Sequence, residues 1–189
     1  SKRDLESSLQ EHSSECKGYN NIQHQMEINA DSFASIAISS HIQQFLEKSF
    51  GDKITKEDAD ETVIIFCACL LNYITSFYKD LSEIYFEEHC HPHPILRLFN
   101  VILNITYNLN NGEYIQRHKI NIDAKELTKE VFNFYEVLEA KEIFSTEFTK
   151  SLNSAYKVKK EIIAHLNSLR EYDTEDYYDA LELWNKHIT

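Results

Sequence analysis

Glycine and proline are scarce in this chain, which has three glycines and two prolines among 189 residues. Sandwiches and barrels of β-strands need many turns rich in these residues, and nucleotide-binding α/β folds need glycine-rich phosphate loops. Both classes are therefore excluded. Because 42% of the residues are hydrophobic and 26% are charged, the chain can bury a core, and wholesale disorder is excluded as well. The composition predicts an all-α protein.

Positive charge is also scarce. The chain carries 19 Lys and Arg residues against 31 Asp and Glu residues, a net charge of −12, and the ranges 1–60, 61–122 and 123–189 are each acidic. The one cationic cluster is Lys157, Lys159 and Lys160, which we interpret as a solvated helix face. Since phosphate backbones require clustered cations, we expect no nucleic-acid partner. An acidic surface keeps a protein soluble and favours a basic protein partner.

No apolar run is long enough for a membrane span. The longest one, residues 63–77, is shorter than the roughly 20 residues that a bilayer requires. No signal peptide is visible at the start, although the chain begins with Ser and a removed leader stays open.

Cysteine is present at four positions: Cys16, Cys67, Cys69 and Cys90. Cys67 and Cys69 lie two residues apart in an apolar helical run, where they cannot bridge each other and instead resemble small buried hydrophobic residues. We find no disulfide framework in this spacing. We therefore expect a cytoplasmic or otherwise reducing compartment, and a secreted effector remains an open alternative.

Hydrophobic periodicity predicts about six helices, over residues 31–49, 56–88, 94–109, 124–143, 146–171 and 175–188. Thr55 and Asp123 are suited to cap helix starts, Pro94 suits a first helical turn, and Gly51 suits a helix end. Residues 114–122 alternate only roughly, and because a lone strand has no ladder partner, we expect a loop or a strand that pairs with another chain. Residues 1–28 are polar and predict a tail or short helix that precedes a single domain over 29–189.

Two of these segments are apolar on more than one face, residues 63–77 and 94–109. A helix of that kind is surrounded by other helices. We therefore predict a globular bundle in which these two helices are largely buried at the centre and amphipathic helices wrap them. Leu70 and Ile102 are expected to lie in its core.

The segment His89-Cys90-His91-Pro92-His93 offers imidazole and thiol ligands suited to Zn²⁺ or copper. No second Cys/His pair follows at a matching spacing. We interpret the segment as a polar loop and expect no cofactor, and we expect substitution of His91 and His93 to leave stability nearly unchanged. The alternative function is a metal-dependent or thiol enzyme that uses His89, Cys90, His91 and His93.

Motifs of the common enzyme classes are missing from the sequence. It contains no G-x-S-x-G nucleophile turn, no H-E-x-x-H zinc motif, no P-loop and no G-x-G-x-x-G. An enzyme is therefore the less favoured reading. Our leading hypothesis is a non-enzymatic protein–protein interaction domain, such as an adaptor, complex subunit, immunity-type protein or effector, whose oligomeric state stays open.

Residues 171–182 are unusually rich in acids and tyrosines. Acids suit a helix start, and tyrosines beside acids also suit docking of a basic partner. The stripe Tyr177, Leu181, Trp184 and Ile188 is expected to pack on the bundle. The candidate partner-binding residues are those off the stripe: Tyr172, Asp176, Tyr178 and Asp179.

Overall fold

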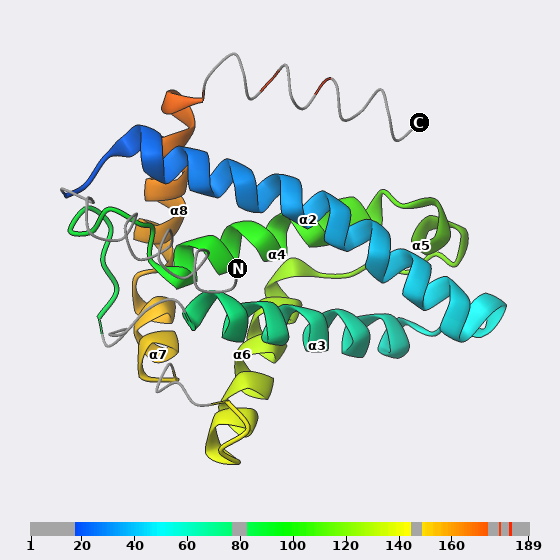
Figure 1. The fold of residues 1–189 in the computed structure, drawn as a ribbon. Coiled ribbons are helices and arrows are strands. Elements are labelled where there is room, and N and C mark those ends of the chain that lie inside the picture. The colour runs from blue at the N-terminus through cyan, green and yellow to red at the C-terminus, as the bar shows by residue number, and fades with distance from the viewer. Residues whose placement is uncertain (1–17, 77–82, 145–148, 174–177, 179–181, 183–189) are drawn as a thin grey trace, which may run out of the picture.

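The computed structural model describes residues 18–76, 83–144, 149–173, 178 and 182. The described residues contain seven α-helices, two short 3₁₀ helices and no strand. These elements are α2 (Asn21–Phe50), η1 (Gly51–Lys53), α3 (Lys56–Thr75), α4 (Pro94–Asn110), α5 (Glu113–Arg117), α6 (Ala124–Ala140), α7 (Thr149–Lys157), α8 (Lys159–Leu169) and η2 (Arg170–Tyr172). The predicted all-α globular bundle is confirmed (Figure 1).

Most helix starts follow from capping side chains in the sequence. Thr55 and Asp58 form a capping box at the start of α3. The Asp123 side chain accepts the N–H groups of Lys125 and Glu126 at 2.9 and 2.8 Å, which caps α6. Pro94 opens α4, and Gly51, with a positive φ of 53°, ends α2. The four predicted boundary residues are therefore confirmed.

Several predicted boundaries are wrong. Helix α2 begins at Asn21, capped by the Asn20 side chain, inside the segment expected to be a polar tail. Helix α3 ends at Thr75, and residues 83–93 lie outside helices. Of the weakly alternating segment, residues 114–117 belong to the short helix α5, and residues 118–122 lie outside helices and strands, as the loop alternative predicts. A break at Val158 divides the predicted helix 146–171 into α7 and α8. The predicted helix 175–188 lies outside the described residues except at positions 178 and 182.

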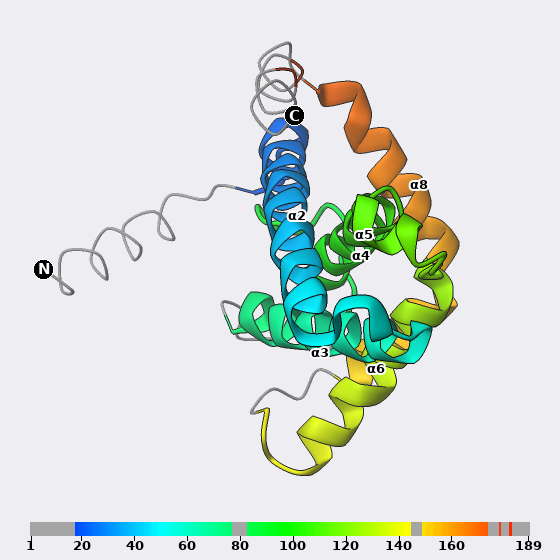
Figure 2. The same ribbon diagram turned by 90° about the vertical axis from the view of Figure 1, so that its right-hand side faces the viewer.

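The core gathers around α4, which packs beneath the long helix α2 and between α3 and α8 (Figures 1 and 2). Its residues Ile95, Leu98, Ile102 and Ile105 have no exposed surface. The side chains that complete the centre of the bundle are Ile42 and Leu46 of α2, Val63, Cys67 and Leu71 of α3, and Val131 and Tyr135 of α6. None of the described helices is long and apolar enough to cross a bilayer.

Two helices were expected to be largely buried at the centre, and α4 meets this expectation more closely than α3, although Leu103 and Tyr107 of α4 are exposed. Helix α4 is buried along most of its length. Helix α3 buries one face, and its other face is open: Ile65 is 50% exposed and Phe66 is 39% exposed. Leu70, expected in the core, is only partly buried, and its neighbour Leu71 takes the fully buried position.

Candidate functional site

The histidine-rich loop leads directly into α4, and His93 is part of that helix start. Its side chain has no exposed surface, and its Nδ1 accepts the N–H of Ile95 at 3.1 Å. The pKa of His93 is lowered to about 4, mainly by burial and also by the nearby His89, while a hydrogen bond with the Glu83 backbone acts in the opposite direction. His93 is thus a neutral capping residue, and the sequence-based expectation that it contributes little to stability does not fit this placement.

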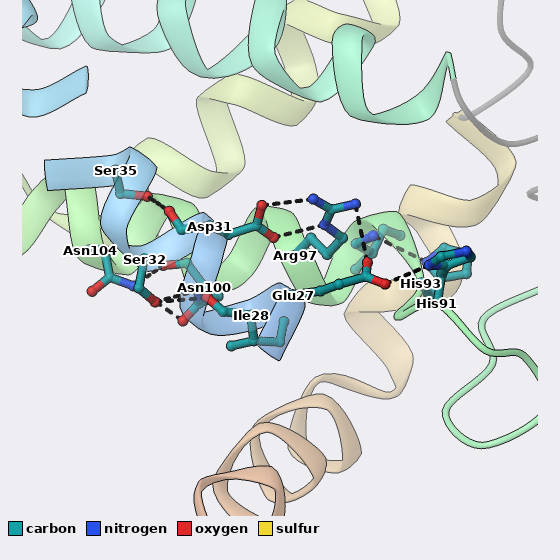
Figure 3. Close-up of polar contacts among 11 residues, drawn as sticks. Glu27, Ile28, Asp31, Ser32, Ser35, His91, His93, Arg97, Asn100 and Asn104 are labelled. Carbon is teal, nitrogen blue, oxygen red and sulfur yellow. Dashed lines mark hydrogen bonds and ion pairs between the residues drawn. The ribbon is translucent and has the colours of Figure 1, made fainter. Parts of the chain in front are cut away.

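His91 joins a network of charged groups between α2 and α4 (Figure 3). Its Nδ1 hydrogen-bonds to a carboxylate oxygen of Glu27. Arg97 of α4 contacts both oxygens of Asp31, at 2.7 and 2.8 Å, and lies 3.6 Å from Glu27. This arrangement clamps α4 to α2, and it gives His91 a structural contact.

Cys90 is disulfide-bonded, whereas Cys67 and Cys69 are free thiols. The expectation that the chain contains no disulfide is therefore wrong, and Cys90 offers neither a thiolate ligand nor a nucleophile in this state. Burial raises the pKa of the Cys67 thiol to about 12, so that thiol is inert. No group of three or more His, Cys, Asp and Glu side chains within the described residues could hold a metal ion.

Two further histidines meet near this loop. His24 of α2 and His165 of α8 are both buried, with ring centroids 6.4 Å apart. The Nε2 of His24 donates to the carbonyl oxygen of His89 at 2.9 Å. Within the described residues, Nδ1 of His24 and Nε2 of His165 have no hydrogen-bond partner. Neither His24 nor His165 belongs to a local sequence motif, so their proximity depends on the folded arrangement of α2 and α8.

The tyrosine-rich candidate site is only partly within the described residues. Tyr172 and Tyr178 are both exposed, and the Tyr178 hydroxyl lies 3.5 Å from a carboxylate oxygen of Asp173. Asp176 and Asp179 lie outside the described residues. Partner binding through these four residues therefore stays a prediction.

The most extensive exposed apolar surface on α3 follows the helical repeat. Ile65, Cys69 and Tyr73 are spaced four residues apart and therefore lie on one side of the helix, and all three are exposed. Phe66 lies beside Ile65 and packs edge-to-face against Phe45 of α2, with ring centroids 6.2 Å apart. We use the name α3 face for Ile65, Phe66, Cys69 and Tyr73 of α3 together with Phe45 of α2.

A groove continues this surface toward α6. Its volume is about 430 Å³, and it is lined by Glu61, Ile64, Ile65, Glu130, Asn133, Phe134 and Val137. The floor is aliphatic and aromatic, and the only charged side chains along it are Glu61 and Glu130. The carboxylate of Glu130 lies 3.9 Å from the ammonium group of Lys129 on the same helix. Because this ion pair is exposed to solvent, it offsets the negative charge of Glu130 only in part. The α3/α6 groove thus joins an apolar floor to an acidic end.

The apolar run in α3 marks this site in the sequence, but it led to the prediction that the residues are buried. A helix that is apolar on every side indicates burial on every side, so the run 63–71 was assigned to the centre of the bundle. The alternative meaning of such a run is an apolar side kept free for another molecule. Sequence periodicity does not distinguish the two.

The chain was compared with family models, with curated proteins and with solved structures, and none of them matches it.

Proposed function

We propose that this chain is a protein-binding module whose α3 face and α3/α6 groove receive an amphipathic, net basic helix of a partner protein. The observation that carries the proposal is the row of exposed apolar side chains on α3: Ile65, Phe66 and Tyr73. Monomeric proteins rarely expose contiguous apolar surface without a use for it, and aromatic residues are enriched where partners bind.

Helical geometry favours a helix as the occupant. A groove between two helices accepts the apolar side of a third helix, with anchor side chains spaced three or four residues apart. Ile64, Ile65, Phe134 and Val137 provide the apolar floor that such anchors need. Tyr73 and Phe45 extend the contact beyond the groove, which matters because a groove of this size is too small for a stable interface alone.

Charge favours a basic partner over a second copy of this chain. Glu61 and Glu130 line the groove, and the molecule as a whole carries a net charge of −12. Two copies would bring like charges together, whereas a Lys or Arg flanking the apolar anchors would be attracted to this end of the groove. These features support a non-enzymatic adaptor, complex subunit or effector, in line with the hypothesis from the sequence.

Photo-crosslinking in the source cells tests the proposal. A benzophenone amino acid replaces Tyr73, which is 62% exposed on the α3 face, or Tyr107, which is 70% exposed on α4. We expect a discrete cross-linked protein from position 73 and none of that protein from position 107. The cross-linked peptide should be amphipathic, with Lys or Arg beside its apolar residues.

A matched pair of charge insertions provides the control. Ile65→Glu places a carboxylate on the α3 face, and Leu103→Glu places one on α4, at residues that are 50% and 52% exposed. We expect Ile65→Glu to abolish the cross-link from position 73 and Leu103→Glu to retain it. Loss with Leu103→Glu and retention with Ile65→Glu, or cross-linking from position 107 only, would place the interface elsewhere.

A further inference from the structure

A second hollow lies beside the α3/α6 groove, where residues of α4, α6 and the start of α8 line it, and Asn133 borders both. Its volume is about 790 Å³, within the usual range of small-molecule sites. It is lined by Phe99, Asp123, Lys125, Glu126, Thr128, Lys129, Asn133 and Lys159. It therefore collects three lysines in a protein with a net charge of −12.

Two of these lysines are available to a ligand. No carboxylate in the described part of the chain lies within ion-pairing distance of Lys125 or Lys159. Lys129 lies 3.9 Å from Glu130, and both of these side chains are exposed. Lys159 belongs to the cationic cluster that the sequence assigned to a solvated helix face, and in the structure it lines this hollow instead.

One of the two carboxylates of the hollow, Asp123, is held at the start of α6, where it accepts two N–H groups. Asp123 and Glu126 also face Lys56 of α3, whose pKa is raised first by its hydrogen bond to Asp60 and further by these carboxylates. The cationic side of the hollow is thus free to face a ligand of opposite charge.

Phe99 supplies the apolar part of the floor of the hollow, beside Thr128, whose hydroxyl donates to the carbonyl oxygen of Ala124. Phe99 and Thr128 are nearly buried, and the ring of Phe99 packs edge-to-face on Phe132 with centroids 6.0 Å apart. A single inorganic anion would fill only a small part of this space. An organic group that covers Phe99 while its charged end reaches the lysines would use both the apolar floor and the cationic rim.

We propose that this hollow binds a small amphiphilic anion, an organic molecule with an apolar body and one sulfonate, carboxylate or phosphate group. Lys125, Lys129 and Lys159 attract the anionic group, and Phe99 with Thr128 contacts the body. The site shares Asn133 with the α3/α6 groove, but it does not depend on the proposed partner.

The test uses the fluorescent probe anilinonaphthalene sulfonate and its uncharged counterpart N-phenylnaphthylamine. The double variant Lys125→Gln, Lys159→Gln should weaken sulfonate binding about fivefold at low salt, since each exposed charge contributes modestly. Added sodium chloride should weaken wild-type binding toward the level of the variant. Binding of the uncharged dye should not change.

Two controls locate the probe. Lys160→Gln removes a charge from the residue next to Lys159 that does not line the hollow, and it should change sulfonate binding less than about twofold. Ile65→Glu should leave binding unchanged, because that residue belongs to the α3 face. The proposal would be overturned if Lys160→Gln weakened sulfonate binding as much as the double variant does, or if Ile65→Glu weakened it. Displacement of the dye by millimolar inorganic phosphate would also overturn it.

Discussion

Cysteines of two kinds occur among the described residues. Cys67 and Cys69 are free, and Cys90 is bonded through its sulfur. The apolar run around Cys67 and Cys69 predicted that both are buried, which is correct for Cys67 and wrong for Cys69, because Cys69 lies on the exposed side of α3. The sequence around Cys90 contained no comparable signal, since a disulfide depends on which residue lies nearby in space. The sequence-based expectation of a reducing compartment loses its main support here, because disulfides persist in oxidising surroundings.

Counting thiols tests the state of Cys90. We expect alkylation of the unfolded, unreduced protein to modify two of the four cysteines, and alkylation after reduction to modify all four. Intact mass spectrometry measures both numbers, and peptide mapping should place the two early labels on Cys67 and Cys69. Modification of Cys90 without reductant would contradict the bond.

His93 shows why a loop residue can matter more than its sequence context indicates. The sequence places it between two prolines, which indicated a solvated loop. In the structure it satisfies the backbone N–H of Ile95 and contacts the ring of Tyr85, with centroids 4.7 Å apart. Pro94 was recognised as the first residue of α4, but the capping role of the preceding His was not, because His is an uncommon cap.

At the scale of helices, starts were predicted better than ends. Thr55, Pro94 and Asp123 act through local chemistry that is visible in the sequence. The end of α3 at Thr75 and the break at Val158 have no Gly or Pro to mark them. Apolar periodicity continues past both points, so tertiary packing decides where these helices stop.

Helix α3 gives a matched comparison of a buried and a half-buried leucine. Leu71 has no exposed surface, whereas Leu70 is partly exposed. We expect Leu71→Ala to lower the free energy of unfolding by about 2–5 kcal/mol, because it leaves a cavity in the core. Leu70→Ala should cost roughly half as much or less, since the site can relax toward solvent.

Urea denaturation followed by circular dichroism measures both values. Equal losses at the two positions, or a larger loss for Leu70→Ala, would show that α3 is rotated relative to the core. Such a rotation would also bury Ile65 and Phe66, so this measurement bears directly on the α3 face.

For the whole molecule, composition and periodicity were sufficient for the fold class and for the buried position of α4. They were not sufficient for the candidate site. Exposure of the α3 face depends on which helices pack beside α3, and the groove depends on the approach of α6. Residues such as Ile65 and Val137, far apart in the chain, form one surface only after folding.

Three buried histidines give the whole molecule a defined response to acid. Burial lowers the pKa of His24, His93 and His165. The nearby His91 also lowers the pKa of His24, and His24 lowers the pKa of His165. The carboxylates of Glu27 and Glu87 raise the pKa of His24, and those of Glu87 and Glu88 raise the pKa of His165. In the unfolded chain each imidazole binds a proton near pH 6.5. The folded state binds this proton only at lower pH. The free energy of unfolding therefore has its full value above about pH 6.5 and decreases as the pH falls below that value.

His93 allows the sign and size of this effect to be measured. The pKa of His93 is about 4 in the folded state. Lowering the pH from 7.5 to 5.5 should therefore decrease the free energy of unfolding of the wild type by about 1 kcal/mol through this residue, before most carboxylates titrate. The variant His93→Asn keeps an acceptor at the start of α4 and cannot be protonated. We expect it to be less stable at pH 7.5, because the ring is lost, and to lose less stability on acidification. His41→Asn, at an exposed position of α2, is the control and should follow the wild type. Urea denaturation at the two pH values measures the loss of unfolding free energy in each variant. An equal loss in the wild type and in His93→Asn would show that the folded state protonates His93 as readily as the unfolded chain does.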